Sequence, residues 1–207
     1  KAYIKIGKYD KAELLLSKFT ESYPFDESMD EILFLQARIN LEMGEIDKAS
    51  EILEKIKNEH PFSVFLNDSE YFMALVNYKK EKYQEAITCL KDYLGKKNIN
   101  YVFEAHLLLY ELFLKLNDLK NAEKEVIILV NRYPEYSGMD RIIFSYAIQV
   151  YEKNQGSADR YFSMLQSMYP ESPYAIQINY IYGSSNFDKK NYSRAITYYE
   201  KFLNSGV

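Results

Sequence analysis

The chain has 207 residues, of which 47% are hydrophobic and 27% are charged, a composition typical of a globular protein with a substantial core. Lysine plus arginine minus aspartate plus glutamate gives 26 − 30 = −4, and the basic residues form no block, so we expect no nucleic-acid binding. The longest uncharged stretch, between Glu171 and Asp188, is too short and too polar to span a bilayer. We therefore expect no direct membrane insertion by this segment.

A small residue returns along the chain at a nearly fixed interval. The steps between successive members are 37, 37, 36, 36 and 37 residues for Ala12, Ala49, Ala86, Ala122, Ala158 and Ala195. Prolines after an aromatic residue keep the same interval at Tyr23-Pro24, His60-Pro61, Tyr133-Pro134 and Tyr169-Pro170. Two markers with one period predict a repeat array, in which each unit buries its apolar faces against its neighbours.

We predict one superhelical domain over residues 1–207. Its repeats lie at about 1–24, 28–61, 68–98, 101–134, 140–170 and 173–204. Because the sequence opens at Lys1, without methionine and in the middle of a helical pattern, we interpret it as a segment of a longer protein.

Each repeat is expected to form two helices. In residues 83–94, for example, the apolar positions follow the spacing i, i+3, i+4, i+7, i+10 and i+11, which places them on one helix face. No segment alternates with period two, so no sheet is expected. The fold predicted is an all-α, right-handed α-solenoid of about six hairpins, with helices near 8–22, 28–43, 46–59, 68–80, 82–95, 101–116, 118–132, 140–153, 157–168, 173–189 and 191–204 and the end of a helix at 1–6.

Several helix starts are marked by capping residues. Ser28 with Glu31 three residues later has the pattern of a capping box. Ser172 before Pro173 is typical of an N-cap followed by proline in the first turn. We also expect caps within the short polar stretches 67–69 and 117–118.

The turn and second helix of each repeat resemble the tetratricopeptide repeat family. The resemblance rests on Gly7-x-Tyr9-x-x-Ala12, Gly44-x-Ile46-x-x-Ala49, Glu81-x-Tyr83-x-x-Ala86, Asn117-x-Leu119-x-x-Ala122 and Lys190-x-Tyr192-x-x-Ala195, together with the closing prolines. The family's small residue in the first helix is present as Ala37, Ala74 and Gly183. The fourth repeat has Tyr110 there, and the fifth has Tyr146 or, with a shorter turn, Ala147. The long period and the Tyr-Pro endings resemble divergent repeats of bacterial cell-envelope proteins, which favours the cell envelope or periplasm over the cytoplasm.

The rare reactive residues fall at positions that the repeat explains structurally. His60 stands where other repeats have tyrosine, His106 where the family often has a packed aromatic residue, and Cys89 at a variable position. The sequence contains no nucleophile–histidine–acid order, phosphate-binding glycine loop or paired-cysteine zinc spacing. We therefore expect no enzyme activity, no cofactor and no metal site.

Two rows of side chains recur in the first helices. An acidic row, which either interacts with the helix dipole or takes a basic ligand, consists of Glu31, Asp68, Glu104 and Asp140. The resemblance implies that first helices line a concave groove, and the groove row predicted for partner binding consists of Phe34, Arg38, Leu41, Tyr71, Leu75, Tyr78, Leu107, Glu111, Leu114, Ile143 or Phe144, Tyr151, Tyr180, Ser184 and Phe187. Each of these residues is alternatively explained by packing between helices.

The function predicted is a non-enzymatic scaffold that binds a partner protein or peptide in this groove, as part of a larger assembly such as a cell-envelope complex. Two alternatives stay open, namely a structural scaffold that self-associates through its edges and uncapped ends, and an accessory or regulatory module of a larger enzyme. Family members that hold acidic chaperone tails use a Lys/Asn clamp on this face. The corresponding positions here carry Phe34, Tyr71 and Leu107, so we expect no binding of such tails.

Overall fold

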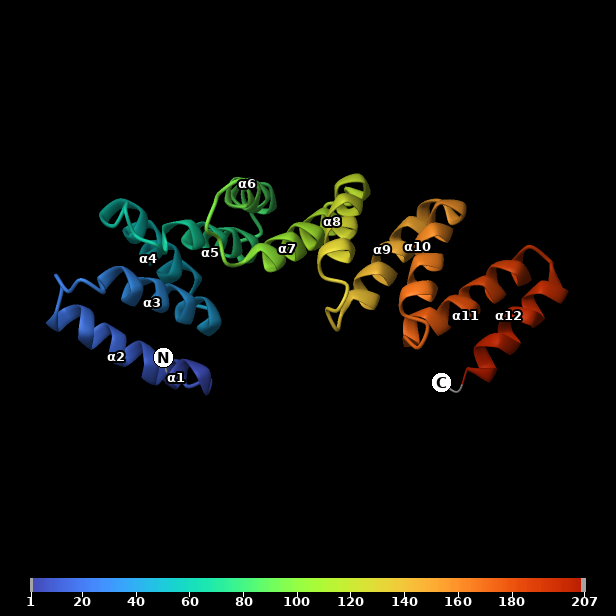
Figure 1. Cartoon of the computed structure of the whole chain (residues 1–207), viewed down its shortest axis with the longest axis horizontal. Coiled ribbons are helices and arrows are strands. Elements are labelled where there is room, and N and C mark those ends of the chain that lie inside the picture. Colours follow the sequence, from blue (N-terminus) through green and yellow to red (C-terminus); the bar gives the residue numbers. More distant parts are fainter. Residues whose placement is uncertain (1, 206–207) are drawn as a thin grey trace. The chain divides into compact units, whose positions relative to one another are not determined.

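The structure is a computed structural model that describes residues 2–205, and within that range every regular element is an α-helix (Figure 1). The predicted all-α repeat fold is confirmed. The helices are α1 (Ala2–Lys5), α2 (Tyr9–Ser22), α3 (Met29–Met43), α4 (Ile46–Glu59), α5 (Leu66–Lys79), α6 (Tyr83–Leu94), α7 (Val102–Lys115), α8 (Leu119–Arg132), α9 (Met139–Lys153), α10 (Gln155–Met168), α11 (Pro173–Asp188) and α12 (Tyr192–Asn204).

The helices form successive hairpins within two compact units, residues 1–105 and 106–207, which divide within α7. In the first unit α2 packs against α3, α3 against α4, α4 against α5, and α5 against α6. In the second unit α8 packs against α9, α9 against α10, α10 against α11, and α11 against α12. The prediction that all repeats form one domain stays a prediction, and the units are described separately.

The repeated alanines lie in the interior of the helix packing. All six are buried, with exposed fractions between 0 and 5%. An alanine leaves little space between two backbones, so a partner helix packs directly on it. The sequence period is therefore the period of the helix packing.

The connection from first to second helix depends on one left-handed residue. In these connections the conformation occurs at Gly7, Gly44, Glu81, Asn117 and Lys190, with φ between 57° and 80°. Glycine adopts this region freely, whereas other residues are strained there by about 1 kcal/mol. The fifth repeat differs, because only Asn154, with extended backbone, separates α9 from α10.

The shorter connection settles the helix position of the fifth repeat. Ala147 is fully buried and takes the small position, while the neighbouring Tyr146 is also buried and points its hydroxyl to the Leu119 carbonyl at 3.2 Å. In the fourth repeat Tyr110 occupies the position itself. Its hydroxyl donates to the Ile142 carbonyl at 3.0 Å and contacts the Ser145 hydroxyl, so the bulky ring is accommodated by bonds to α9.

Two of the four predicted helix caps are confirmed by a side-chain hydrogen bond. The Asp118 carboxylate accepts from the Asn121 amide at 3.2 Å, and the Ser172 hydroxyl accepts from the Tyr174 amide at 3.2 Å. The capping box at Ser28 is wrong, since its hydroxyl donates to Asp26 and makes no cap bond. The cap within residues 67–69 is also wrong, because α5 already begins at Leu66.

Candidate partner-binding face of the first helices

The predicted groove row divides by burial. Phe34, Leu41 and Tyr71 are buried, with 4 to 7% of their surface exposed. Most other members are half-buried, and Glu111, Tyr180 and Phe187 are exposed. Of the alternatives for the fifth repeat, Ile143 is fully buried and Phe144 is half-buried. Partner binding by this row stays a prediction, and the exposed and half-buried members are the ones able to reach a partner.

Three aromatic members, Phe34, Tyr71 and Phe144, pack between consecutive first helices. Each stacks on an aromatic residue 30 or 31 positions later, at the start of the next first helix. The ring centroids are 5.0, 4.9 and 5.0 Å apart for Phe34–Phe65, Tyr71–Tyr101 and Phe144–Tyr174. Such pairs add stability beyond their buried area. This position in the repeat therefore serves mainly as a packing contact between neighbouring repeats.

Arg38 lies over the aromatic cluster of the first unit. Its guanidinium carbon is 5.9 Å from the centre of the Phe34 ring and 5.6 Å from that of Phe72. The side chain is half-buried, and within residues 2–205 no carboxylate forms an ion pair with it. These distances are within the range of a cation–π contact, which leaves the guanidinium N–H groups able to donate to an acceptor.

Two carboxylates act on the same Tyr101 phenol as Arg38 does. Burial raises the pKa of the Tyr101 phenol, the nearby Arg38 guanidinium lowers it, and the carboxylates of Asp68 and Glu104 raise it again. Tyr101 also meets the Phe72 ring edge-on at 5.1 Å. The site therefore combines one positive charge, an apolar aromatic surface and neighbouring negative charge within a few side chains.

The acidic row is partly used inside the fold. The Asp68 carboxylate is buried and accepts hydrogen bonds from the Tyr93 hydroxyl and from the backbone and side chain of Asn100. In the second unit Asp140 accepts from the Ser172 hydroxyl at 2.7 Å. The bonds of Asp68 with Asn100 and of Asp140 with Ser172 each span 32 residues and join one repeat to the next. Glu104 is exposed, and it is the member of the row with the most open surface.

The reactive residues have packing roles. His106 Nδ1 lies 2.7 Å from Glu125 Oε2, and both residues are buried between α7 and α8. His60 is the residue at the end of α4, as its position in the repeat predicts. Cys89 is half-buried, and burial raises the pKa of its thiol. Across residues 2–205 no group of metal-binding side chains comes together, and no helix in that range is long and apolar enough to cross a membrane.

Sequence reasoning missed Phe65, Phe72 and Tyr101, which belong to the aromatic cluster beside Arg38. A signal was present, because Phe65 and Tyr101 are 36 residues apart and so share the repeat period. Phe65 stands directly before α5 and Tyr101 directly before α7, where periodicity alone does not show which face of the fold a side chain joins.

Comparisons with known proteins agree with this architecture. Residues 33–135 match a family model described as YfiO, an outer membrane lipoprotein, and residues 176–205 match a tetratricopeptide repeat model. No curated protein matches the chain.

Solved structures give the same fold at low sequence identity. YrrB, described as a TPR protein with an unusual peptide-binding site, has a TM-score of 0.62 and 16% identity, over 91% of this chain and 92% of that one. MamA from Desulfovibrio magneticus RS-1 has a TM-score of 0.59 and 17% identity, over 85% and 94%. A tetratricopeptide repeat protein from Parabacteroides merdae has 0.59 and 15%, over 99% and 75%. With the hairpins and their period, these matches show that the chain has the tetratricopeptide-repeat fold.

Proposed function

We propose that this chain is a non-enzymatic scaffold whose first helices hold a segment of a partner protein. The observation that carries the proposal is Arg38, a half-buried cation placed on aromatic rings with no ion-pair partner in the described residues. A buried or half-buried charge is normally paired, because leaving it alone costs free energy. A carboxylate of the partner would supply the missing pair.

The surroundings of Arg38 define the chemistry of the partner segment. Leu75 and Tyr78, both half-buried on α5, offer apolar area, and the Tyr78 ring lies 6.0 Å from that of Tyr83. Glu104, exposed near Tyr101, favours a basic side chain. The segment we propose therefore carries an apolar anchor with one acidic and one basic residue close by, bound as a helix or an extended chain.

We place the scaffold in a larger assembly of the bacterial cell envelope. The match of residues 33–135 to an outer membrane lipoprotein family supports this placement, as do the Tyr-Pro endings of the repeats. The alternatives of self-association and of an accessory role to an enzyme remain distinguishable by the partner that is captured.

The test is capture of the partner by photocrosslinking. Benzoylphenylalanine is introduced at Leu75, and the fragment is incubated with extract of the source organism. Arg38→Met keeps the aliphatic packing on the rings and removes the charge. The matched control is Lys55→Met, which removes an exposed cation from α4 that pairs with Glu59.

Loss of a charge-assisted bond is worth about 1.5–3 kcal/mol, so Arg38→Met should weaken capture by about 10- to 100-fold while Lys55→Met captures as wild type does. Equal capture by both variants, at unchanged helicity, would contradict the proposal and direct attention to the other surfaces.

A further inference from the structure

A pocket of about 420 Å³ lies in the first unit between the second helices α4 and α6, over α5. Its apolar floor consists of Leu53, Leu66, Met73 and Cys89. This volume is within the range of sites that hold a ligand group. No residue of the predicted groove row takes part in it.

The pocket is on a different side of α5 from the proposed partner face. Met73 lines the pocket, whereas Leu75 belongs to the groove row, and two residues along a helix turn it by about 200°. A partner segment on the first helices would therefore leave the pocket open.

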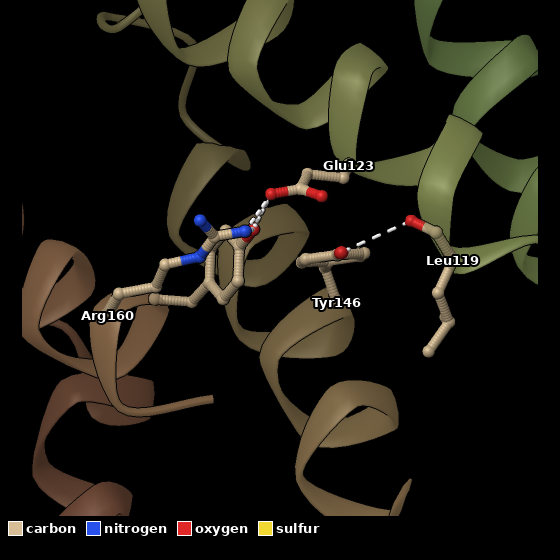
Figure 2. Close-up of polar contacts among 5 residues, drawn as sticks. Leu119, Glu123, Tyr146 and Arg160 are labelled. Atoms are coloured by element: carbon tan, nitrogen blue, oxygen red, sulfur yellow. Dashed lines mark hydrogen bonds and ion pairs between the residues drawn. The ribbon is translucent and has the colours of Figure 1, made fainter. Parts of the chain in front are cut away.

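The corresponding positions of the second unit carry different side chains. By the repeat alignment, Met73 and Cys89 correspond to Tyr146 and Tyr161, 73 and 72 residues further on. Those two rings meet edge-to-face at 4.7 Å, and both are buried. Glu123 and Arg160 bind the Tyr161 hydroxyl, and Tyr146 donates to Leu119 (Figure 2). Both tyrosines line a hollow of about 530 Å³ in the second unit, whereas the first-unit pocket has a thioether and a thiol in place of the two phenols.

The pocket continues along α5 into a second hollow of about 550 Å³. The two share Glu54, Lys57, Met73 and Cys89. A side chain seated in the first hollow would leave room for its main chain in the second. This shape suits a peptide segment better than an isolated small molecule.

The rim selects the charge of the occupant. Glu54 and Asp92 are exposed and have no ion pair within the described residues, whereas Glu70 pairs with Lys96. Lys57 is the remaining cation, so three carboxylates face two ammonium groups. Burial is the largest cause that raises the pKa of the Cys89 thiol. The negative charges of Glu70 and Asp92 raise this pKa further, as expected for a negative potential in the pocket.

We propose that this second-helix pocket binds an apolar side chain of a partner protein that is flanked by lysine or arginine. Its apolar floor would take the anchor, and Glu54 and Asp92 would attract the flanking cation. The proposal is independent of partner binding by the first helices, so each can fail without the other.

The test is a titration followed by ¹³C-methyl methionine NMR. The chain has six methionines, of which Met73 lines the pocket and the other five serve as internal controls. The probes are three capped tripeptides, Arg-Phe-Arg, Glu-Phe-Glu and Arg-Ala-Arg. The first should shift the Met73 methyl saturably, with the other two binding at least about tenfold more weakly, because each lacks either the charge or the anchor.

Two variants keep the proposal falsifiable. Glu54→Gln with Asp92→Asn changes only exposed side chains and should abolish the preference for the basic peptide. Cys89→Tyr places a large ring at the pocket lining and should abolish the Met73 shift, with helicity checked by circular dichroism. Equal shifts of all methionines, equal binding of the three peptides, or binding that survives Cys89→Tyr would each overturn the proposal.

Discussion

The Asp68 carboxylate is the strongest polar link between repeats of the first unit, and its removal gives the sharpest stability prediction. It accepts from the Tyr93 hydroxyl at 2.9 Å and from the Asn100 amide at 3.1 Å, and the same tyrosine oxygen accepts from the Tyr101 amide at 2.8 Å. Asp68 is 4% exposed and Tyr93 is fully buried. The Asp68→Ala substitution therefore leaves a buried hydroxyl donor without an acceptor.

The magnitude follows from which donors can find water. Asn100 is exposed and can bond to solvent, so losing its hydrogen bonds to Asp68 costs little free energy. The Tyr93 hydroxyl cannot, and stranding one buried donor beside a lost charged acceptor costs about 2–3 kcal/mol. Asp68→Asn keeps one acceptor oxygen and should cost about 1 kcal/mol.

Urea unfolding followed by circular dichroism measures these costs. The control is Asp92→Ala, which removes an exposed carboxylate of the same unit and should unfold at the wild-type urea concentration. A double-mutant cycle of Asp68→Ala with Tyr93→Phe should give a coupling of about 1–2 kcal/mol. A cost below about 0.5 kcal/mol for Asp68→Ala, or no coupling, would refute the view that this link is stabilising.

Three further results are expected. In Gly183→Ala the new Cβ would lie 2.6 Å from the Tyr199 ring, so urea unfolding should show a net loss of about 1–2 kcal/mol, whereas Gly156→Ala, whose new Cβ would have Asn154 Oδ1 as its nearest atom at 3.7 Å, should cost nothing; equal effects would contradict this packing. Burial raises the pKa of Tyr110 to about 12, and the unfolded phenol ionises near pH 10, so the free energy of unfolding should fall from pH 10 to 12, and a flat profile would argue against it. Calorimetry with an acidic chaperone tail should show no submillimolar binding, because the single cation Arg38 has carboxylates nearby; measurable affinity would show that no clamp is needed.

The helices and their pairing were predictable because they depend on local and periodic features. A period of 36 or 37 residues, an alanine at a fixed place and apolar spacing along each helix determine where helices lie and which face is buried. The capping box at Ser28 failed because the Glu31 amide, from which the Ser28 oxygen was expected to accept, donates to the Asp30 carboxylate instead. Local sequence does not rank two such competing hydrogen bonds.

The candidate sites depended on contacts between repeats. The spacing of Phe34 and Tyr71 places them on the first helices, but their burial follows from Phe65 and Tyr101, which reach them from the next repeat. Arg38 was visible in the sequence, whereas its seat on the Phe34 and Phe72 rings was not. Aromatic residues are equally suited to a core and to a surface, so only their neighbours decide.

The sequence by itself determined the architecture, because the helix period and the small residues act within a few turns of the chain. The tertiary structure alone decided what each polar or surface side chain is available for. Asp68 is used by residues up to 32 positions away, and the pocket beside Met73 and Cys89 is lined by side chains from α4, α5 and α6. Both outcomes depend on which atoms of distant residues reach the same volume, and the order of residues along one helix does not contain that information.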